Sequence, residues 1–340
     1  MRLRTSDPHV PGWRRVRHGR GFRYLDTAGT PLSPADRERV RALVIPRAWQ
    51  DVWICPWPNG HIQAVGTDDA GRRQYLYHSA FREQQDAAKH EHVQEVARSL
   101  PRLRKQVAQD IAGRGLTRTR VLACITRLLD LGFLRIGGER YARDNGSFGL
   151  TTLLREHAAC RRGEIRLRFP AKSGKEVTRT MVDQQAHAVV RALLRRQDES
   201  PRLFAYWEQG TWHDVHAGDL NAYLQDGAGK DLTAKDFRTW YATVLAAVAL
   251  AVSESTADES SARRGKVVAR AVREVSDYLG NTPAVCRASY IHPRLIELYE
   301  DGRTIADALG KLGKDGSFGQ PATHGAVERA VLRLLQSDPA

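Results

Sequence analysis

The N-terminal quarter of the chain alternates short apolar runs with turn residues. The runs are rich in β-branched and aromatic residues, and Asn-Gly and Asp-x-Gly turns separate several of them, which is the pattern of an antiparallel meander. They are FRYLD, DVWICPW, HIQAVG and RRQYLYH. One helix is expected over residues 33–45, because Ser33 suits the capping position and Pro34 the first helical position. The sequence therefore predicts a small β-rich domain over residues 1–84.

Beyond about residue 84 the apolar positions recur three and four residues apart, which is the spacing of amphipathic helices. The clearest segments are AAKHEHVQEVARSL, LRKQVAQDIAG, LTRTRVLACITRLLDLGFLRIG, TMVDQQAHAVVRALLRR, TAKDFRTWYATVLAAVALAVSE, VVARAVREVSDYLG and ATHGAVERAVLRLLQS. Between them, residues 164–181 alternate about a Ser-Gly turn and predict a hairpin. We expect an α+β protein whose second domain, residues 85–340, is mainly α-helical with this small sheet.

Positive charge is spread along the whole chain. Its 53 Lys and Arg residues against 39 Asp and Glu give a formal net charge of +14 and a pI near 10.0. Arginines recur in both halves rather than in one tail, which favours a nucleic acid partner over a membrane. No apolar run approaches the roughly 20 residues that span a bilayer, and the N-terminus lacks the apolar segment of a secretory signal. The expected location is the cytoplasm.

The segment LGNTPAVCRASY predicts a helix with a tyrosine near its end. Thr282 can cap this helix and Pro283 suits its first position. The helix should stop soon after Tyr290, because the residue before Pro293 is pushed toward extended geometry.

Polar side chains in four spaced segments match, in order, the motifs of one enzyme family. The segments LRIGGERYARDNGSFGLTTL, LRFPAKSGKEV, LTAKDFRTWYA and LGNTPAVCRASY supply Arg135, Lys172, Arg238, Asn281 and Tyr290. With residues 45–78, they resemble the type IB DNA topoisomerases, in particular the compact bacterial and poxvirus enzymes. The resemblance extends from about residue 21 to residue 293. It implies relaxation of supercoiled DNA by transient single-strand cleavage through a 3′-phosphotyrosyl intermediate, strand rotation and religation.

The chemistry of this reaction suits the matched residues. A phenol can store the energy of a phosphodiester in a covalent bond, so Tyr290 fits the role of nucleophile. Arg135 and Arg238 can clamp the equatorial phosphate oxygens. We expect no cofactor, ATP or metal, because SGKEV lacks the Ser or Thr that follows Lys in a phosphate-binding loop and no carboxylate cluster is placed to hold metal ions. The four cysteines also form no C-x-x-C pair.

Lys172 and Asn281 are expected to differ in role. The departing 5′ oxygen needs a proton, which a lysine ammonium can donate and an arginine cannot. Lys172 is therefore the candidate acid, and its alternative is a solvated hairpin lysine. Asn281 stands where the poxvirus enzymes have histidine. Its amide can bond a non-bridging oxygen but cannot exchange a proton at neutral pH, so we expect charge stabilisation only. The group that deprotonates the nucleophile stays open.

In the N-terminal domain the resemblance implies DNA contacts at RRQYLYH. The residues concerned are Arg72, Arg73, Gln74, Tyr75 and Tyr77. Glutamine can read adenine and arginine can hold phosphates. The alternative is a strand whose two tyrosines share one face and pack in the core.

Two other functions remain as alternatives. A tyrosine recombinase or integrase shares this chemistry, and Lys235 with Arg238 keeps the spacing of its H-x-x-R motif with lysine first. Recombinases carry a helical N-terminal domain, however, whereas this one is predicted to be β-rich. A non-catalytic DNA-binding protein is disfavoured because all the active-site positions are filled. We expect a nucleoid-associated monomer that clamps double-stranded DNA between its two domains.

Overall fold

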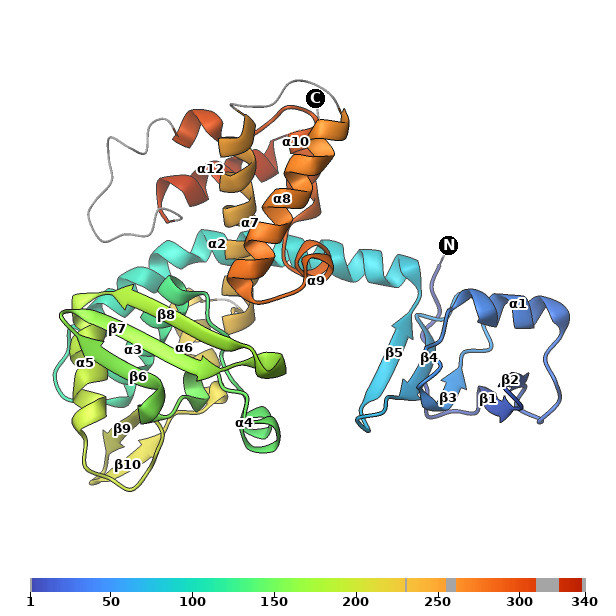
Figure 1. The fold of residues 1–340 in the computed structure, drawn as a ribbon, viewed down its shortest axis with the longest axis horizontal. Coiled ribbons are helices and arrows are strands. Elements are labelled where there is room, and N and C mark those ends of the chain that lie inside the picture. The colour runs from blue at the N-terminus through green and yellow to red at the C-terminus, as the bar shows by residue number, and fades with distance from the viewer. Residues whose placement is uncertain (1, 230, 255–260, 310–323, 338–340) are drawn as a thin grey trace. The chain divides into compact units, whose positions relative to one another are not determined.

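The computed structural model describes residues 2–229, 231–254, 261–309 and 324–337. The chain forms two compact units, residues 1–90 and 91–340. Helix α2 (Ser79–Ile111) runs through this division (Figure 1). The boundary expected at residue 84 also lies inside α2. Pro101 lies within α2 without ending it, so two helices expected from the pattern are one.

The N-terminal unit is built on a five-stranded antiparallel sheet of order β2-β1-β3-β4-β5. Its strands are β1 (Trp13–His18), β2 (Gly21–Leu25), β3 (Gln50–Ile54), β4 (Ile62–Thr67) and β5 (Arg73–Tyr77). Helix α1 (Pro34–Ala42) begins as predicted, since the Ser33 hydroxyl accepts a hydrogen bond from the backbone N–H of Asp36. Val40 of this helix packs with Val52 and Ile54 of β3 in a small core. The predicted β-rich unit is confirmed.

The C-terminal unit is mainly helical, as predicted. Its helices are α3 (Arg118–Gly132), α4 (Glu139–Asn145), α5 (Gln184–Arg195), α6 (Ala217–Ala228), α7 (Ala234–Glu254), α8 (Ser261–Leu279), α9 (Pro283–Ser289), α10 (Pro293–Glu300) and α12 (Ala326–Gln336). Helices α7 and α8 lie side by side (Figure 1). Phe237, Trp240 and Tyr241 of α7 are almost fully buried, so this helix lies at the centre of the core.

Two small sheets complete the unit. The predicted hairpin forms β7 (Glu164–Pro170) and β8 (Glu176–Val182), and β6 (Ala158–Arg161) adds a third antiparallel strand in the order β6-β7-β8. Strands β9 (Ala205–Glu208) and β10 (Thr211–Asp214) form a separate hairpin. In β7 the side chains alternate between exposed and buried, so one face of this sheet packs on the core.

A buried polar network joins four of the helices. Arg104 of α2 donates to Asp130 of α3 (Nε to Oδ2, 2.9 Å), to Glu328 of α12 (Nη1 to Oε2, 2.7 Å) and to the hydroxyl of Tyr241 of α7 (from Nη2, 2.7 Å). Burial acts to raise the pKa of Asp130, but the Arg104 guanidinium holds that pKa below its usual value. The network thereby fixes α12 against α7, which carries Arg238.

Candidate active site

The end of helix α8 has a defined backbone turn that places Asn281. Gly280 adopts the left-handed conformation (φ +66°), which favours glycine. The N–H of Gly280 donates to the carbonyl of Asp277 (3.1 Å), and the N–H of Asn281 donates to that of Ser276 (2.9 Å). This pair of bonds is a Schellman motif. It reverses the chain and puts Asn281 just beyond the helix.

Helix α9 follows at once and places Tyr290. The Thr282 hydroxyl accepts from the N–H of Val285 and Pro283 is at the first position, as predicted. Tyr290 is the residue at the C-terminal cap, and its N–H donates to the carbonyl of Cys286 (3.0 Å). Its own carbonyl accepts from the hydroxyl of Thr243 on α7 (3.3 Å). The backbone of the tyrosine is therefore held by both α9 and α7.

Arg238 is the most deeply buried of the candidate residues, at 5% exposed. Its Nη1 donates to the carbonyl of Phe133 (2.6 Å) and its Nη2 to that of Leu279 (2.8 Å). The guanidinium carbon lies 5.7 Å from the ring centroid of Tyr290. Burial lowers the pKa of Arg238 to about 10, the charge of Arg135 acts in the same direction, and Tyr290 acts to raise it. The Nε atom is buried and has no hydrogen-bond partner.

Arg135 and Asn281 are directly bonded. Nη2 of Arg135 donates to Oδ1 of Asn281 over 2.6 Å. Burial lowers the pKa of Arg135, while Tyr290 acts to raise it. The Nδ2 atom of Asn281 is buried without a partner, like Nε of Arg238. Arg135 therefore occupies the acceptor oxygen of the Asn281 amide, and the donor nitrogen of that amide has no partner.

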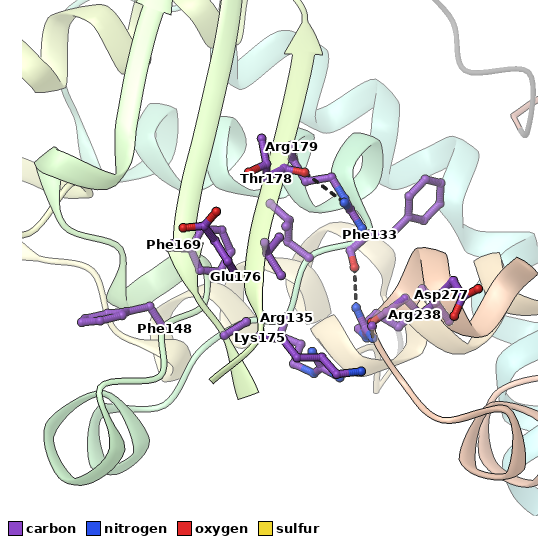
Figure 2. Close-up of a pocket in the computed structure, with 15 residues that line it drawn as sticks. Phe133, Arg135, Phe148, Phe169, Lys175, Glu176, Thr178, Arg179, Arg238 and Asp277 are labelled. Carbon is purple, nitrogen blue, oxygen red and sulfur yellow. Dashed lines mark hydrogen bonds between the residues drawn. The ribbon is translucent and has the colours of Figure 1, made fainter. Parts of the chain in front are cut away.

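A pocket of about 220 Å³ lies beside the two arginines. Figure 2 shows Arg135, Lys175, Arg179 and Arg238 among the side chains that line it, together with a hydrogen bond from Arg238 to Phe133. Lys175 and Arg179 were not among the residues expected from the sequence. Both come from the hairpin β7–β8, and the inward side of β8 could have revealed Arg179, because a cation there interrupts an apolar row.

Lys172 is not brought into contact with the other candidates. It begins a single turn, Lys172–Gly174, between β7 and β8, and it is exposed. Its side chain makes none of the hydrogen bonds or ion pairs found in the described part of the chain. Its neighbour Ala171 and the nearby Lys175 do line the pocket. The structure thus groups Arg135, Arg238, Asn281 and Tyr290, and leaves Lys172 on an adjoining turn.

Strand β5 of the N-terminal unit presents two tyrosines on its exposed face. Tyr75 and Tyr77 are 39% and 40% exposed, and their rings stack with centroids 6.1 Å apart. The alternative that they pack in the core is therefore wrong. Arg73 is exposed with them, whereas Arg72 (Nε) and Gln74 (Nε2) donate to Oδ2 of Asp68, each over 2.9 Å. The DNA contacts of these residues stay a prediction.

The described residues contain neither a candidate metal site nor a helix that could span a membrane. Among residues 2–229, 231–254, 261–309 and 324–337, no three His, Cys, Asp or Glu side chains are grouped so that they could hold a metal ion. No described helix has both the length and the apolar character needed to cross a membrane.

Comparison with known proteins identifies the class that this fold and site define. Residues 78–310 match the family described as eukaryotic DNA topoisomerase I, catalytic core. Residues 21–68 match the bacterial DNA topoisomerase IB N-terminal domain. The chain therefore belongs to the type IB DNA topoisomerases, the isomerases that relax DNA.

Curated viral relatives support this assignment. The chain is 33% identical to DNA topoisomerase 1B of Acanthamoeba polyphaga mimivirus, over 82% of this chain and 84% of the relative. It is 21% identical to DNA topoisomerase I of monkeypox virus and to DNA topoisomerase 1B of vaccinia virus, in each case over 73% of this chain and 75% of the relative. The family predicted from the sequence is confirmed. The comparisons therefore favour a type IB topoisomerase over the two alternatives, a tyrosine recombinase and a non-catalytic DNA-binding protein.

Proposed function

We propose that Tyr290 is the nucleophile of this topoisomerase and that Arg135, Arg238 and Asn281 bind the scissile phosphate. The observation that carries this proposal is a group of buried N–H donors without partners: Nε of Arg238, Nδ2 of Asn281 and, on the neighbouring strand β8, Nε of Arg179. Buried polar groups in native proteins nearly always have partners, so several unpartnered donors grouped at one site indicate that a ligand binds there. A phosphodiester supplies anionic oxygen acceptors, which form strong hydrogen bonds to such donors.

The reaction follows from these positions. The phenol oxygen of Tyr290 loses its proton and attacks phosphorus, the bond from phosphorus to the 5′ oxygen breaks, and a 3′-phosphotyrosyl link forms. The departing 5′ oxygen takes up a proton and becomes a free hydroxyl. The cut strand rotates about the intact strand, and the same steps in reverse reseal the DNA. The covalent link stores the bond energy, so the cycle needs no ATP.

Arg238 is preorganised for its role. Its two terminal nitrogens are held by the carbonyls of Phe133 and Leu279, so the direction of its Nε–H is set before DNA binds. A fixed donor costs little reorganisation when charge develops on the phosphate. Arg135 is held in the same way by Oδ1 of Asn281. The clamp consists of two guanidinium groups and one amide, and it requires no metal ion.

Lys172 is proposed as the proton donor to the 5′ oxygen. Its support is the family motif and the location of its turn, since Ala171 before it and Lys175 after it both line the pocket beside Arg238. A long flexible ammonium side chain suits delivery of a proton from such a position. Asn281 takes no part in proton transfer, because an amide does not titrate near neutral pH.

The N-terminal unit is proposed to bind the duplex through the exposed face of β5. Arg73 supplies charge for phosphates, and the stacked rings of Tyr75 and Tyr77 supply an aromatic surface beside it. Arg72 and Gln74 share an acidic partner, Asp68, so their contacts with DNA would require a change of partner. We propose that one chain closes around double-stranded DNA as a monomer and acts on the DNA of the cytoplasm.

The test is relaxation of a supercoiled plasmid by the purified chain with EDTA and without ATP. We expect full relaxation, and we expect Tyr290→Phe to be inactive while Tyr206→Phe, on β9, relaxes like the wild type. Loss of wild-type activity on chelation would contradict the metal-free mechanism. Activity of Tyr290→Phe would contradict the choice of nucleophile.

A further inference from the structure

Arg179 occupies an inward position in a strand whose other inward residues are apolar. In the antiparallel register it lies opposite Leu167, which is fully buried, and residues paired in this way share one face of the sheet. Its neighbours on that face of β8 are Val177 and Met181. Arg166 of β7, by contrast, is on the outward face. A half-buried arginine in an apolar row requires a specific partner.

That partner is the end of helix α8. A helix leaves its last four carbonyls without helical partners. Here the Schellman bonds satisfy those of Ser276 and Asp277. The carbonyl of Tyr278 accepts from Nη2 of Arg179, and that of Leu279 accepts from Nη2 of Arg238. The two arginines therefore complete the same helix end, where the negative end of the helix dipole also favours cations.

Aromatic contacts link the two arginines a second time. The guanidinium carbon of Arg179 lies 4.9 Å from the ring centroid of Tyr278. That ring meets Phe133 edge to face, with centroids 5.3 Å apart at 72°. The carbonyl of Phe133 accepts from Nη1 of Arg238 over 2.6 Å. Arg179 and Arg238 thus hold the same helix end through the carbonyls of Tyr278 and Leu279. Both line the same pocket (Figure 2), and Nε of each is buried without a partner.

We infer that Arg179 is a positioning residue for the cleavage reaction. By holding the carbonyl and ring of Tyr278, it fixes the last turn of α8 and so the placement of Leu279, which orients Arg238, and of Asn281. This inference rests on the proposed roles of Arg238 and Asn281. A displacement of about 1 Å in a catalytic group can slow a reaction up to about a hundredfold. Water can reach the exposed bond from Arg179 to Tyr278 and replace it, so its loss should cost placement rather than folding.

The test compares Arg179→Ala with Arg166→Ala, which removes an equal charge from the outward face of the same sheet. Single-turnover cleavage of a suicide DNA substrate is measured at saturating DNA, and DNA affinity is measured separately as a function of salt. We expect Arg179→Ala to cleave about tenfold more slowly than Arg166→Ala, with the same affinity and salt dependence. Arg179→Lys should recover part of the rate, because an ammonium reaches the carbonyl but lacks the planar group that stacks on the ring.

The opposite results would overturn the inference. Cleavage by Arg179→Ala at the rate of Arg166→Ala would show that the helix end does not depend on Arg179. A weaker affinity with a salt slope reduced by about one relative to Arg166→Ala would make Arg179 a direct phosphate contact instead. If Arg179→Ala fails to fold, Tyr278→Leu, which removes the stacked ring, should show the same slow cleavage, and a wild-type rate would refute positioning. A wild-type chain that does not cleave would refute the proposed function itself.

Discussion

Replacing Asn281 by aspartate distinguishes the role of the amide oxygen from the role of the amide nitrogen. Oδ1 accepts from Nη2 of Arg135 over 2.6 Å, and an aspartate oxygen can keep that bond. Nδ2 is the buried donor without a partner, which we propose to bind the scissile phosphate. Aspartate replaces this donor with an anionic oxygen. The substitution therefore retains the support of Arg135 but turns an attraction for the phosphate into a repulsion.

The expected magnitudes form an ordered series. A hydrogen bond to a charged group is worth about 1.5–3 kcal/mol, and each 1.36 kcal/mol is tenfold in rate, so Asn281→Ala should cleave about ten- to hundredfold more slowly. Asn281→Asp should be slower than Asn281→Ala, because it loses the same bond and adds like-charge repulsion. Asn281→His should recover much of the loss, because a ring N–H can reach the same oxygen.

The assay is single-turnover cleavage of a suicide DNA substrate, with urea unfolding of each variant as the control for folding. Aspartate cleaving as fast as alanine would refute the contact between Nδ2 and the phosphate. Alanine cleaving at the wild-type rate would reduce Asn281 to a residue that shapes the turn between α8 and α9 and nothing more.

Three further outcomes are expected. Tyr290→Phe should bind DNA normally and yield no covalent adduct after denaturation, and a trapped adduct would rule out this nucleophile. Lys172→Ala should cleave an ordinary phosphodiester slowly but a 5′-bridging phosphorothiolate much faster, because a thiolate leaves without a proton; equal defects would remove Lys172 as the acid. Arg104→Ala should lower the free energy of unfolding in urea by about 3–5 kcal/mol, because Asp130 and Glu328 stay buried without their cation, and a loss below about 1 kcal/mol would contradict that reasoning.

Local signals in the sequence were sufficient for the elements that carry the site. Ser33 before Pro34 and Thr282 before Pro283 each predicted a helix start, and both hydroxyls do cap their helices. These predictions held because capping depends on residues within one turn of each other. The family motifs also selected five residues as a group. The structure places Arg135, Arg238, Asn281 and Tyr290 together and leaves Lys172 on an adjoining exposed turn.

The alternation of apolar and polar residues was less informative about which face of a strand is exposed. Alternation showed that Tyr75 and Tyr77 share a face but did not show which face is exposed, because that depends on what the sheet packs against. The hairpin of β9 and β10 was not predicted, since strands of four residues carry too few alternating positions to stand out. The short strand β6 was missed for the same reason.

The sequence by itself determined the family, the helix that carries Tyr290 and the residues that can bind a phosphate. Only the tertiary structure decided how these residues support one another. Arg135 and Asn281 are 146 positions apart along the chain, and Arg179 and Tyr278 are 99 apart. No local pattern encodes such pairs, because they form only when the segment after α3, strand β8 and the end of α8 pack around one core. For the same reason the unpartnered donors of Arg238 and Asn281 are a property of the folded chain, since a donor is orphaned only once burial has removed it from water.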